Sequence, residues 1–234
     1  MNILAMDTST QTMGVAVLND NIPLGELSTT IKKNHSVRLM PAIDHVMREV
    51  NMAPAELDKI VSAKGPGSYT GVRIGLMTAK SMAWSLSIPI TGVSSLEGLA
   101  LQGRFYHSYI CPFFDARRGL VYTGLYRWHH DTLELVMAER NILMHDWLDE
   151  LAALGHDILF LSPDMSLHKE YIQRRLAHKA VIPADSSPAI NPVHLAWAGQ
   201  KKEADNTHTL TPNYLRLAEA EAKWLQKQRD DLNG

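Results

Sequence analysis

The sequence predicts an α/β protein made of two lobes of similar design. Short apolar runs of strand-like composition alternate along the chain with segments in which apolar residues recur at helical spacing. An apolar run that ends in an aspartate and a turn opens the chain at Asp7, and the pattern returns about 108 residues later at Asp115. The length of 234 residues permits two such units, each with its own core.

The first lobe should open with three strands and a helix. Strands are expected at 3–6, 15–18 and 24–30, the first followed by the turn formers Asp7–Thr10. A helix should then begin near Ser36, a good N-cap. Its apolar face carries residues at helical spacing, namely Leu39, Ile43, Val46, Met47 and Val50.

Pro41 falls inside this helix at 36–50. Because proline lacks an N–H and its ring meets an earlier carbonyl, it predicts either a local kink or a later helix start. A strand at 60–63, a glycine-rich loop, a helix at 72–86 and a strand at 89–93 complete the lobe.

The second lobe repeats the strand–aspartate–turn–strand opening in pattern, though not in residue identity. Strands are expected at 109–114, 120–128 and 157–161, and helices at 145–154, 167–177, after Asn191-Pro192 and at the charged C-terminus. We place the lobes at 1–103 and 104–234. Two duplicated, ribonuclease-H-like lobes with helices on their faces fit the actin/Hsp70-like (ASKHA) architecture.

Composition limits the classes of function that the chain can have. Twenty-three basic and 25 acidic residues give a net charge of −2, and no run of Lys or Arg marks a footprint for nucleic-acid phosphates. The single cysteine, Cys111, lies in an apolar run and reads as a buried structural thiol. With neither a signal peptide nor an apolar stretch long enough to span a bilayer, we expect no membrane association and a cytoplasmic protein.

Two segments are candidates for binding an anion or nucleotide. Asp7–Thr10 follows the first strand, where an aspartate either contacts metal-bound phosphates or caps its own turn. The run Gly65–Gly75 begins with a glycine-rich loop before a helix, which either receives an anion at the helix N-terminus or forms a rigid turn with Thr70 as N-cap. The weak nucleotide candidates are Asp7, Ser9, Thr10, Gly67 and Ser68.

The helix after this loop carries small residues at every fourth position, namely Gly71, Gly75, Ala79 and Ala83. Such a ridge allows close approach by another element, either inside the lobe or from a partner. Beside it, bulk comes from Ile74, Met77, Thr78, Met82 and Trp84. Together with the helix at 36–50 this predicts a partner interface at Leu39, Ile43, Met47, Gly71, Ile74, Gly75, Thr78, Ala79 and Met82.

The eleven histidines do not form a metal motif. Neither His-x-x-x-His nor Cys-x-x-Cys occurs, and there is no Gly-x-Ser-x-Gly elbow of the kind that hydrolases use. These residues are therefore read as solvated or core histidines, and the sequence predicts no metal site.

Several segments resemble the bacterial TsaB (YeaZ) family in order and spacing. They are residues 3–9, 35–41, 64–75, 92–98, 114–117 and 212–216, and Lys64-Gly-Pro-Gly-Ser-Tyr-Thr-Gly-Val-Arg-Ile-Gly75 is the most specific of them. The resemblance implies a partnership with the related enzyme TsaD and the ATPase TsaE, in an assembly that forms N6-threonylcarbamoyladenosine in tRNA. It also implies docking through the helices at 36–50 and 70–86, and a homodimer when the chain is alone.

The resemblance further implies a subunit that is not itself catalytic. The catalytic paralogue carries His-Met-Glu-Gly-His as metal ligands, and the matching residues here are Ser95-Leu-Glu-Gly-Leu99. On this basis we expect no cofactor beyond a nucleotide at the partner junction, and only indirect contact with tRNA. The alternatives are an actin-fold ATPase or small-molecule kinase that uses Asp7 and the Gly65–Gly75 loop, and a peptidase, for which the sequence offers no activated nucleophile.

Overall fold

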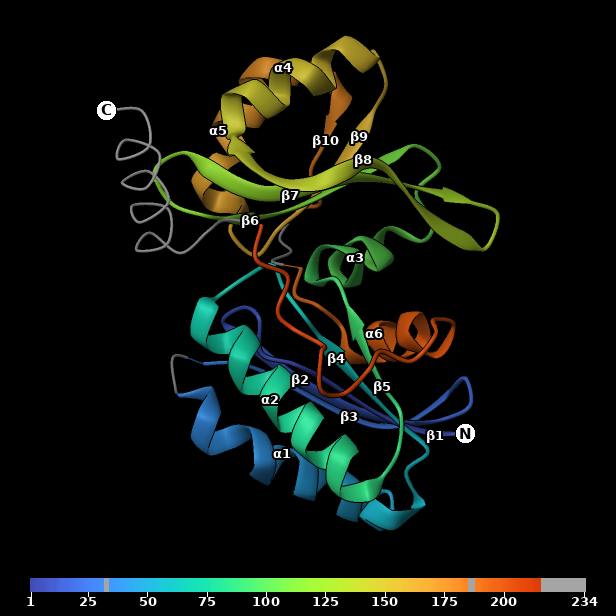
Figure 1. The fold of residues 1–234 in the computed structure, drawn as a ribbon. Helices are drawn as coiled ribbons and strands as arrows, with labels where there is room; N and C mark the ends of the chain where they lie inside the picture. The colour runs from blue at the N-terminus through green and yellow to red at the C-terminus, as the bar shows by residue number, and fades with distance from the viewer. Residues whose placement is uncertain (32–33, 185–187, 216–234) are drawn as a thin grey trace, which may run out of the picture.

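The computed structural model describes residues 1–31, 34–184 and 188–215. The described chain forms two β-sheets stacked one above the other, with one pair of helices on each outer side and two helices between the sheets (Figure 1). The predicted C-terminal charged helix lies outside the described residues.

The first sheet has five strands in the order β3-β2-β1-β4-β5. β1 runs antiparallel to β2 and parallel to β4, so the chain's first strand occupies the centre of the sheet. The strands are β1 (Asn2–Asp7), β2 (Thr12–Asn19), β3 (Ile22–Thr30), β4 (Lys59–Ala63) and β5 (Ile90–Val93).

The second sheet also has five strands, in the order β10-β9-β6-β7-β8. Its central strand β6 runs antiparallel to β7 and parallel to β9. The strands are β6 (Tyr109–Asp115), β7 (Leu120–His129), β8 (Thr132–Leu143), β9 (Ile158–Leu161) and β10 (Ala180–Val181). Read from the opposite edge, this order and these directions repeat those of the first sheet. The predicted duplication of ribonuclease-H-like lobes is confirmed.

Outer helices seal one face of each sheet. α1 (His35–Glu49) and α2 (Tyr69–Leu86) cover the first sheet, and α4 (Met144–Leu154) and α5 (Met165–Leu176) cover the second. Alternation along the central strand explains the two-sided burial, because successive side chains point to opposite faces. Leu4 and Met6 pack under α1 and α2, whereas Ile3 and Ala5 face the middle of the molecule.

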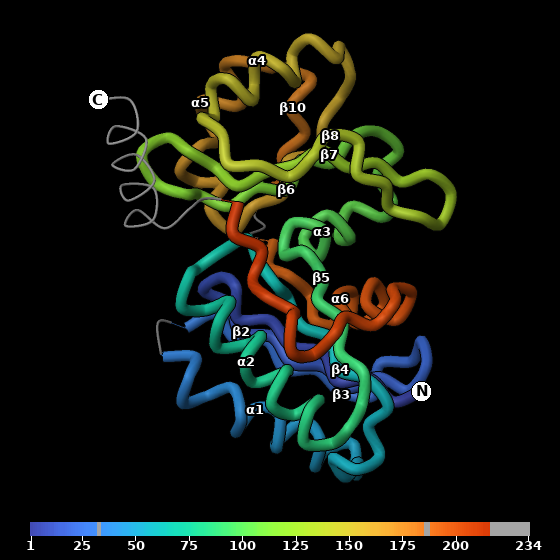
Figure 2. The backbone as a smooth tube through the Cα atoms, viewed as in Figure 1, coloured from blue at the N-terminus to red at the C-terminus, as the bar shows by residue number. Residues whose placement is uncertain are grey.

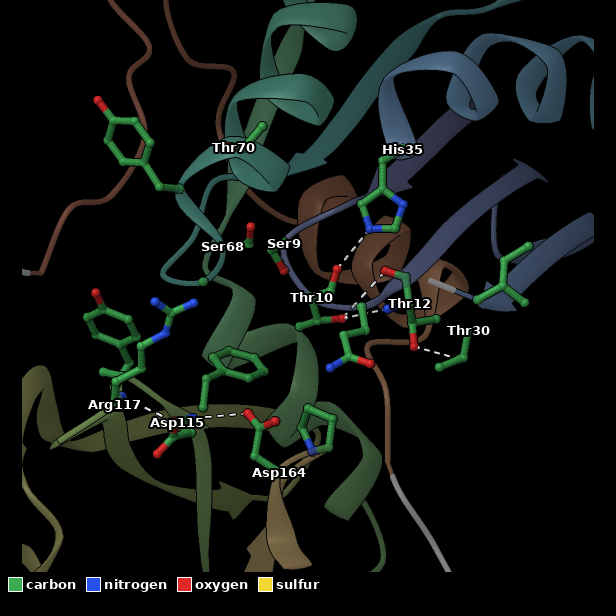
Figure 3. Close-up of a pocket in the computed structure, with 18 residues that line it drawn as sticks. Ser9, Thr10, Thr12, Thr30, His35, Ser68, Thr70, Asp115, Arg117 and Asp164 are labelled. Atoms are coloured by element: carbon green, nitrogen blue, oxygen red, sulfur yellow. Dashed lines mark hydrogen bonds between the residues drawn. The ribbon is translucent and has the colours of Figure 1, made fainter. Parts of the chain in front are cut away.

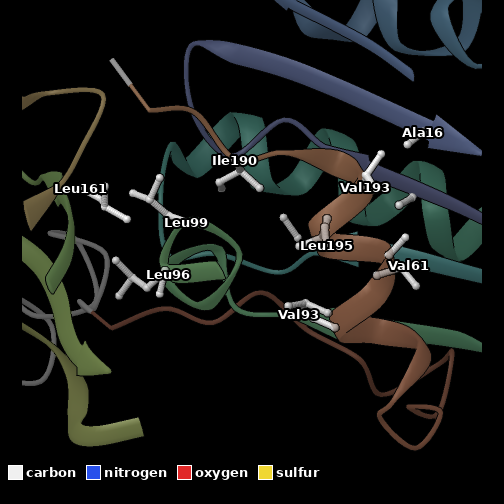
Figure 4. Packing of buried hydrophobic residues seen from close by; sticks show 14 of the residues in the cluster. Ala16, Val61, Val93, Leu96, Leu99, Leu161, Ile190, Val193 and Leu195 are labelled. Atoms are coloured by element: carbon white, nitrogen blue, oxygen red, sulfur yellow. The ribbon is translucent and has the colours of Figure 1, made fainter. Parts of the chain in front are cut away.

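The middle of the molecule is a core shared by both sheets. α3 (Ser95–Ala100) follows the first sheet but packs on β6 and β7, and α6 (Pro192–Gln200) follows the second sheet but packs on β1, β2 and β4. Figure 4 shows Leu96 and Leu99 of α3 lying toward Leu161 of the second lobe, and Val193 and Leu195 of α6 lying near Val61. This exchange of helices joins the lobes through apolar contact.

After α6 the chain returns past α2 and reaches the junction of the lobes (Figure 2). Lys80 of α2 donates to the carbonyls of His208 and Leu210, and the N–H of Asn213 donates to the carbonyl of Lys64 at 2.7 Å. This segment, residues 205–215, therefore binds the first lobe through its backbone.

The structure differs from the sequence prediction in several local features. α1 continues through Pro41 from His35, with Asn34 as its N-cap in place of Ser36, so the helix does not start later. Ser68, and not Thr70, caps α2. The twelve-residue strand β8 was missed altogether. Within the described residues, none of the helices has the length and apolar character needed to cross a membrane.

Candidate functional site

A cleft of about 1090 Å³ opens between the two lobes. The first lobe contributes the turn after β1, the start of α1 and the start of α2, and the second lobe contributes the turn after β6 and the segment after β9. Figure 3 shows Ser9, Thr10 and Ser68 on one side of this space, facing Asp115 and Asp164 on the other. The ends of the two central strands therefore meet across one cavity.

Asp7 sits at the end of β1 but does not line the cleft. Its side chain is buried, and Oδ1 accepts a hydrogen bond from the N–H of Ser9 at 2.8 Å, the geometry of an Asx-turn. Burial raises the pKa of Asp7 to about 6, although interactions with Ser9 and His35 oppose that rise. Asp7 therefore caps its own turn, which is the structural alternative that the sequence left open.

The glycine-rich loop is packed directly against this turn. The N–H of Ser68 donates to the carbonyl of Ser9 at 2.7 Å, and a Cβ on Gly67 would lie only 2.3 Å from the same oxygen. The Ser68 side chain accepts from the N–H of Gly71 and caps α2. One loop N–H that would bind an anion is thus already paired with backbone. The arrangement favours the rigid turn over the phosphate cradle.

Four of the five nucleotide candidates still reach the cavity. Ser9, Thr10, Gly67 and Ser68 line it, and His35 of α1 lies beside them, with Nε2 at 2.9 Å from the Thr10 carbonyl. The Oγ of Ser9 has no hydrogen-bond partner among the described residues. This wall is polar, and its titratable side chains are His35 and Tyr69.

The opposite wall carries the charge of the cleft. Asp115 ends β6 and accepts from the N–H of Arg117 at 3.1 Å, and its Oδ1 lies 3.0 Å from Nε2 of His168. The N–H of Asp115 donates to Oδ2 of Asp164 at 3.0 Å. Sequence reasoning did not select these residues as a site. The signal that could have identified them was the strand–aspartate–turn pattern of Asp7, which recurs at Asp115.

Ser95 and Leu99, the positions at which the resemblance implied the loss of two metal ligands, lie inside the molecule. Leu99 is fully buried and lies toward Leu161 of the second lobe (Figure 4). Ser95 is also buried, with no hydrogen-bond partner for its Oγ among the described residues. An isobutyl group offers no donor atom to a metal. The part of the chain that the structure describes contains no group of three or more His, Cys, Asp or Glu side chains able to hold a metal ion.

The small-residue ridge of α2 faces inward. A Cβ on Gly71 would lie 2.2 Å from the carbonyl oxygen of Thr8, and one on Gly75 would lie 2.5 Å from the Thr8 hydroxyl, which itself donates to the Gly71 carbonyl. These glycines let α2 approach the turn after β1. Six of the nine predicted interface residues are therefore buried inside their own lobe, namely Leu39, Ile43, Met47, Gly71, Gly75 and Ala79.

The other three, Ile74, Thr78 and Met82, remain partly exposed. Thr78 and Met82 line a groove of about 520 Å³ between α1 and α2. Met40 and Met77 line the same groove and are 49% and 52% exposed, and sequence reasoning did not select them. Trp84, on the same helix as Met77, is 67% exposed. The groove on this helix pair is therefore lined by two of the predicted residues and by exposed neighbours that were not predicted.

Two ribonuclease-H-like sheets joined through a common core, with a cleft between their central turns, define a two-lobed protein of the actin-like class. The family model described as tRNA N6-adenosine threonylcarbamoyltransferase (TsaD) matches residues 25–224. The tRNA threonylcarbamoyladenosine biosynthesis protein TsaB of Bacillus subtilis is 51% identical over 98% of this chain and 100% of its own length.

Solved structures agree with this relationship. A crystal structure titled YeaZ from Pseudomonas aeruginosa superposes with a TM-score of 0.76 at 25% identity, and covers 92% of this chain and 99% of that one. A second structure from the same organism, titled as an uncharacterized protein with similarity to peptidase YeaZ, gives a TM-score of 0.78 at 26% identity with the same coverage. The chain belongs to the TsaB (YeaZ) family.

Proposed function

We propose that this protein is a structural subunit in the formation of N6-threonylcarbamoyladenosine in tRNA, and that it docks on a TsaD subunit through α1 and α2. TsaE is the expected further member of the assembly. In this proposal the chain does not carry out the transfer, contacts tRNA only through its partners, and forms a homodimer through the same helices when alone.

The names of the relatives support the pathway. Proteins from Bacillus subtilis and Escherichia coli that bear the name of threonylcarbamoyladenosine biosynthesis are 51% and 29% identical to this chain. The match to the TsaD family model extends over most of both lobes, which supports a common origin with the transferase.

The state of the cleft supports a role without catalysis. Asp7 is withdrawn from the cavity, Ser68 bonds the Ser9 turn, and Leu99 fills the core where the paralogue places a metal ligand. The single cysteine, Cys111, is buried, and its burial raises the pKa to about 11, so it supplies no thiolate nucleophile near neutral pH. These features disfavour both phosphate chemistry and cysteine-peptidase chemistry.

The observation that carries the docking proposal is the apolar groove between α1 and α2. Exposed Met40, Met77 and Trp84 place large apolar side chains on one helix pair, as at protein interfaces. Methionine adapts its shape to more than one partner surface, which suits a face that binds both a paralogue and a second copy of the chain. A stable contact of this kind buries about 800 Å² on each side.

The test is co-purification with TsaD of variants in the groove. Met77→Glu and Ile74→Glu each place a charge on this face, and we expect each to weaken binding at least about tenfold because the carboxylate loses its hydration on docking. Leu167→Glu is the matched control. Leu167 lies on α5 of the second lobe and is 66% exposed, so a charge there should leave binding unchanged.

Gly75 is a poor site for this test, because any side chain there strikes Thr8 and disturbs the fold. Thermal unfolding of the two glutamate variants separates misfolding from loss of docking. Full TsaD binding by both folded variants would remove the interface from the proposal. Threonylcarbamoyladenosine formation with purified TsaD and TsaE then reports whether docking is required for the reaction.

The size of the cleft favours one further candidate, an actin-fold ATPase or small-molecule kinase. Ser9, Thr10, Gly67 and Ser68 would receive the phosphates from one side and Arg117 from the other. Calorimetric titration with Mg-ATP distinguishes the candidates. We expect no turnover by the isolated chain, and tight binding with hydrolysis would replace the structural role with an enzymatic one.

A further inference from the structure

A second cavity, of about 630 Å³, lies where the lobes meet around α3 and α6. Its walls come from the turn between β2 and β3, from α6, from residues 97–104 and from the β7–β8 hairpin. In Figure 1 this hairpin and α6 lie on the side of the molecule opposite the start of α2, where the interlobe cleft opens. The volume falls in the range that holds a small ligand. None of the residues discussed for docking or for the cleft lines it.

Aromatic rings dominate this cavity. Trp128 of β7 comes from the second lobe, and Trp197 and His194 come from α6. His194 and Trp197 are stacked, with ring centroids 5.2 Å apart and an interplanar angle of 23°. The Trp197 N–H donates to the carbonyl of Asn21 at 3.2 Å, which fixes that indole against the turn between β2 and β3. Two indoles and one imidazole therefore line a single small cavity.

Positive charge lies beside the rings. The Arg104 guanidinium is 5.8 Å from the centre of the Trp128 ring and 3.6 Å from the exposed carboxylate of Asp131. Lys202 pairs with Glu97 at 3.0 Å, whereas Lys201 has no ion pair among the described residues. The lining therefore carries three cations against two carboxylates. One positive charge remains uncompensated.

Two polar atoms of the lining residues have no partner in the described chain. They are Nε1 of Trp128 and Nδ1 of His194, both withdrawn from solvent. Burial, and then the charge of Arg104, lowers the pKa of His194, so the imidazole is neutral at pH 7. An unpaired buried polar atom costs stability, and a bound ligand, water or ion that supplies the missing partner is one explanation for it.

We propose that this cavity binds one nucleotide, with its base against the indoles of Trp128 and Trp197 and its phosphate near Arg104 and Lys201. Proteins that bind single-stranded nucleic acid with little sequence preference stack the bases on aromatic rings and place cations near the phosphates. The source of the nucleotide is either a free mononucleotide or one unit of a single-stranded RNA. Both present the same base and phosphate to the cavity. The proposal stands independently of docking on TsaD.

Calorimetric titration of the full chain tests it with three probes: AMP, UMP and an eight-residue single-stranded RNA. We expect binding of at least one probe, weakened about tenfold by Trp197→Leu and by Trp128→Leu. Lys201→Glu should weaken binding about fivefold without touching a buried group. RNA affinity at least tenfold above that of AMP, with a steep salt dependence, identifies an RNA strand as the source. Equal affinities identify the mononucleotide.

Two controls place the binding in this cavity. Tyr171→Leu removes an exposed aromatic ring on α5, outside both cavities, and should change nothing. Arg117→Ala alters the interlobe cleft and should also leave the affinity unchanged. If the tryptophan variants unfold, Lys201→Glu and Arg104→Gln decide the matter.

The proposal is overturned if no probe binds with a Kd below about 1 mM. It is also overturned if the folded pocket variants bind like the parent chain, or if Arg117→Ala alone weakens binding.

Discussion

The two outer helix pairs occupy equivalent places on the two sheets, yet their surfaces differ. α1 and α2 leave an apolar groove lined by Met40 and Met77. α4 and α5 are instead joined by an ion pair in which Arg175 donates to Asp149 at 2.6 Å. Because the strand order beneath them is the same, the fold does not dictate the outer surface. The outer surfaces of the two lobes can therefore differ while the sheets beneath them keep the same strand order.

The turns that follow the two central strands, β1 and β6, also differ between the lobes. Both central strands end in an aspartate that accepts the N–H two residues later, at Asp7 and at Asp115. In the first lobe the next loop reaches this turn by backbone, through Ser68 and Ser9. In the second lobe the contact is made by the side chain of Asp164. The equivalent turns of the two lobes are therefore held by different kinds of contact, although both border the same cleft.

The largest effect on stability is expected from a side chain placed at Gly71, where α2 packs against the turn after β1. In Gly71→Ala the new Cβ would lie 2.2 Å from the Thr8 carbonyl, a backbone atom that cannot rotate away. We expect a loss of about 3 kcal/mol or more in the free energy of unfolding, because α2 must move off the turn. Urea unfolding measures it.

Ser81→Ala is the control for that experiment, since Ser81 is exposed on the same helix. It should change stability by no more than about 0.5 kcal/mol. A Gly71→Ala variant as stable as the parent chain would mean that α2 does not depend on its close approach to Thr8.

A smaller effect, dependent on pH, is expected from Asp7→Asn. The folded protein holds the Asp7 proton more tightly than the unfolded chain does, because burial raises the pKa from 3.8 to about 6. The contribution of this group is therefore fully present below about pH 4 and is lost as the pH rises to about 6.

Over that window the parent chain should lose about 2 to 3 kcal/mol in the free energy of unfolding through this group. The asparagine variant should lack this part of the decline. Denaturant unfolding at pH 4, 5, 6 and 7 checks the difference, and parallel profiles for the two proteins would refute the shifted pKa.

The surroundings of Asp7 and Gly71 show which features of the fold the sequence predicts and which it does not. Apolar runs predicted the strands around Asp7 and Asp115, since burial on both sides leaves an unbroken apolar signal. β8 was missed because only one side of this edge strand is covered, and Glu134, Glu139 and Arg140 interrupt its pattern. The spacing of Gly71 and Gly75 revealed a close contact. It did not reveal that the neighbour was Thr8, because that contact joins residues far apart in the chain.

The candidate site, too, was predicted from the sequence only in part. Helical periodicity identified the α1 and α2 pair, but it also led to the residues that face the core, since apolar spacing reports burial and not exposure to a partner. Pro41 was expected to kink α1 or delay its start, and the helix begins before it, at His35, with Leu39, Ile43 and Met47 buried on its inner face. The cavity near Trp128 and Trp197 was not predicted. It depends on the exchange of α3 and α6 between lobes, which strand and helix patterns do not encode.

The smallest effect is expected at the ion pair that joins α4 and α5. Arg175 and Asp149 have side chains that are 48% and 59% exposed, so water screens their attraction. Arg175→Ala should lower the free energy of unfolding by less than about 1 kcal/mol, and 1 M NaCl should shrink the difference further. Met77→Ala on α2 is the counterpart in the other lobe, where we expect weaker association with little change in monomer stability. If Arg175→Ala instead impaired binding to TsaD while Met77→Ala did not, the charged helix pair would be the docking face, and the contrast drawn between the two lobes would reverse.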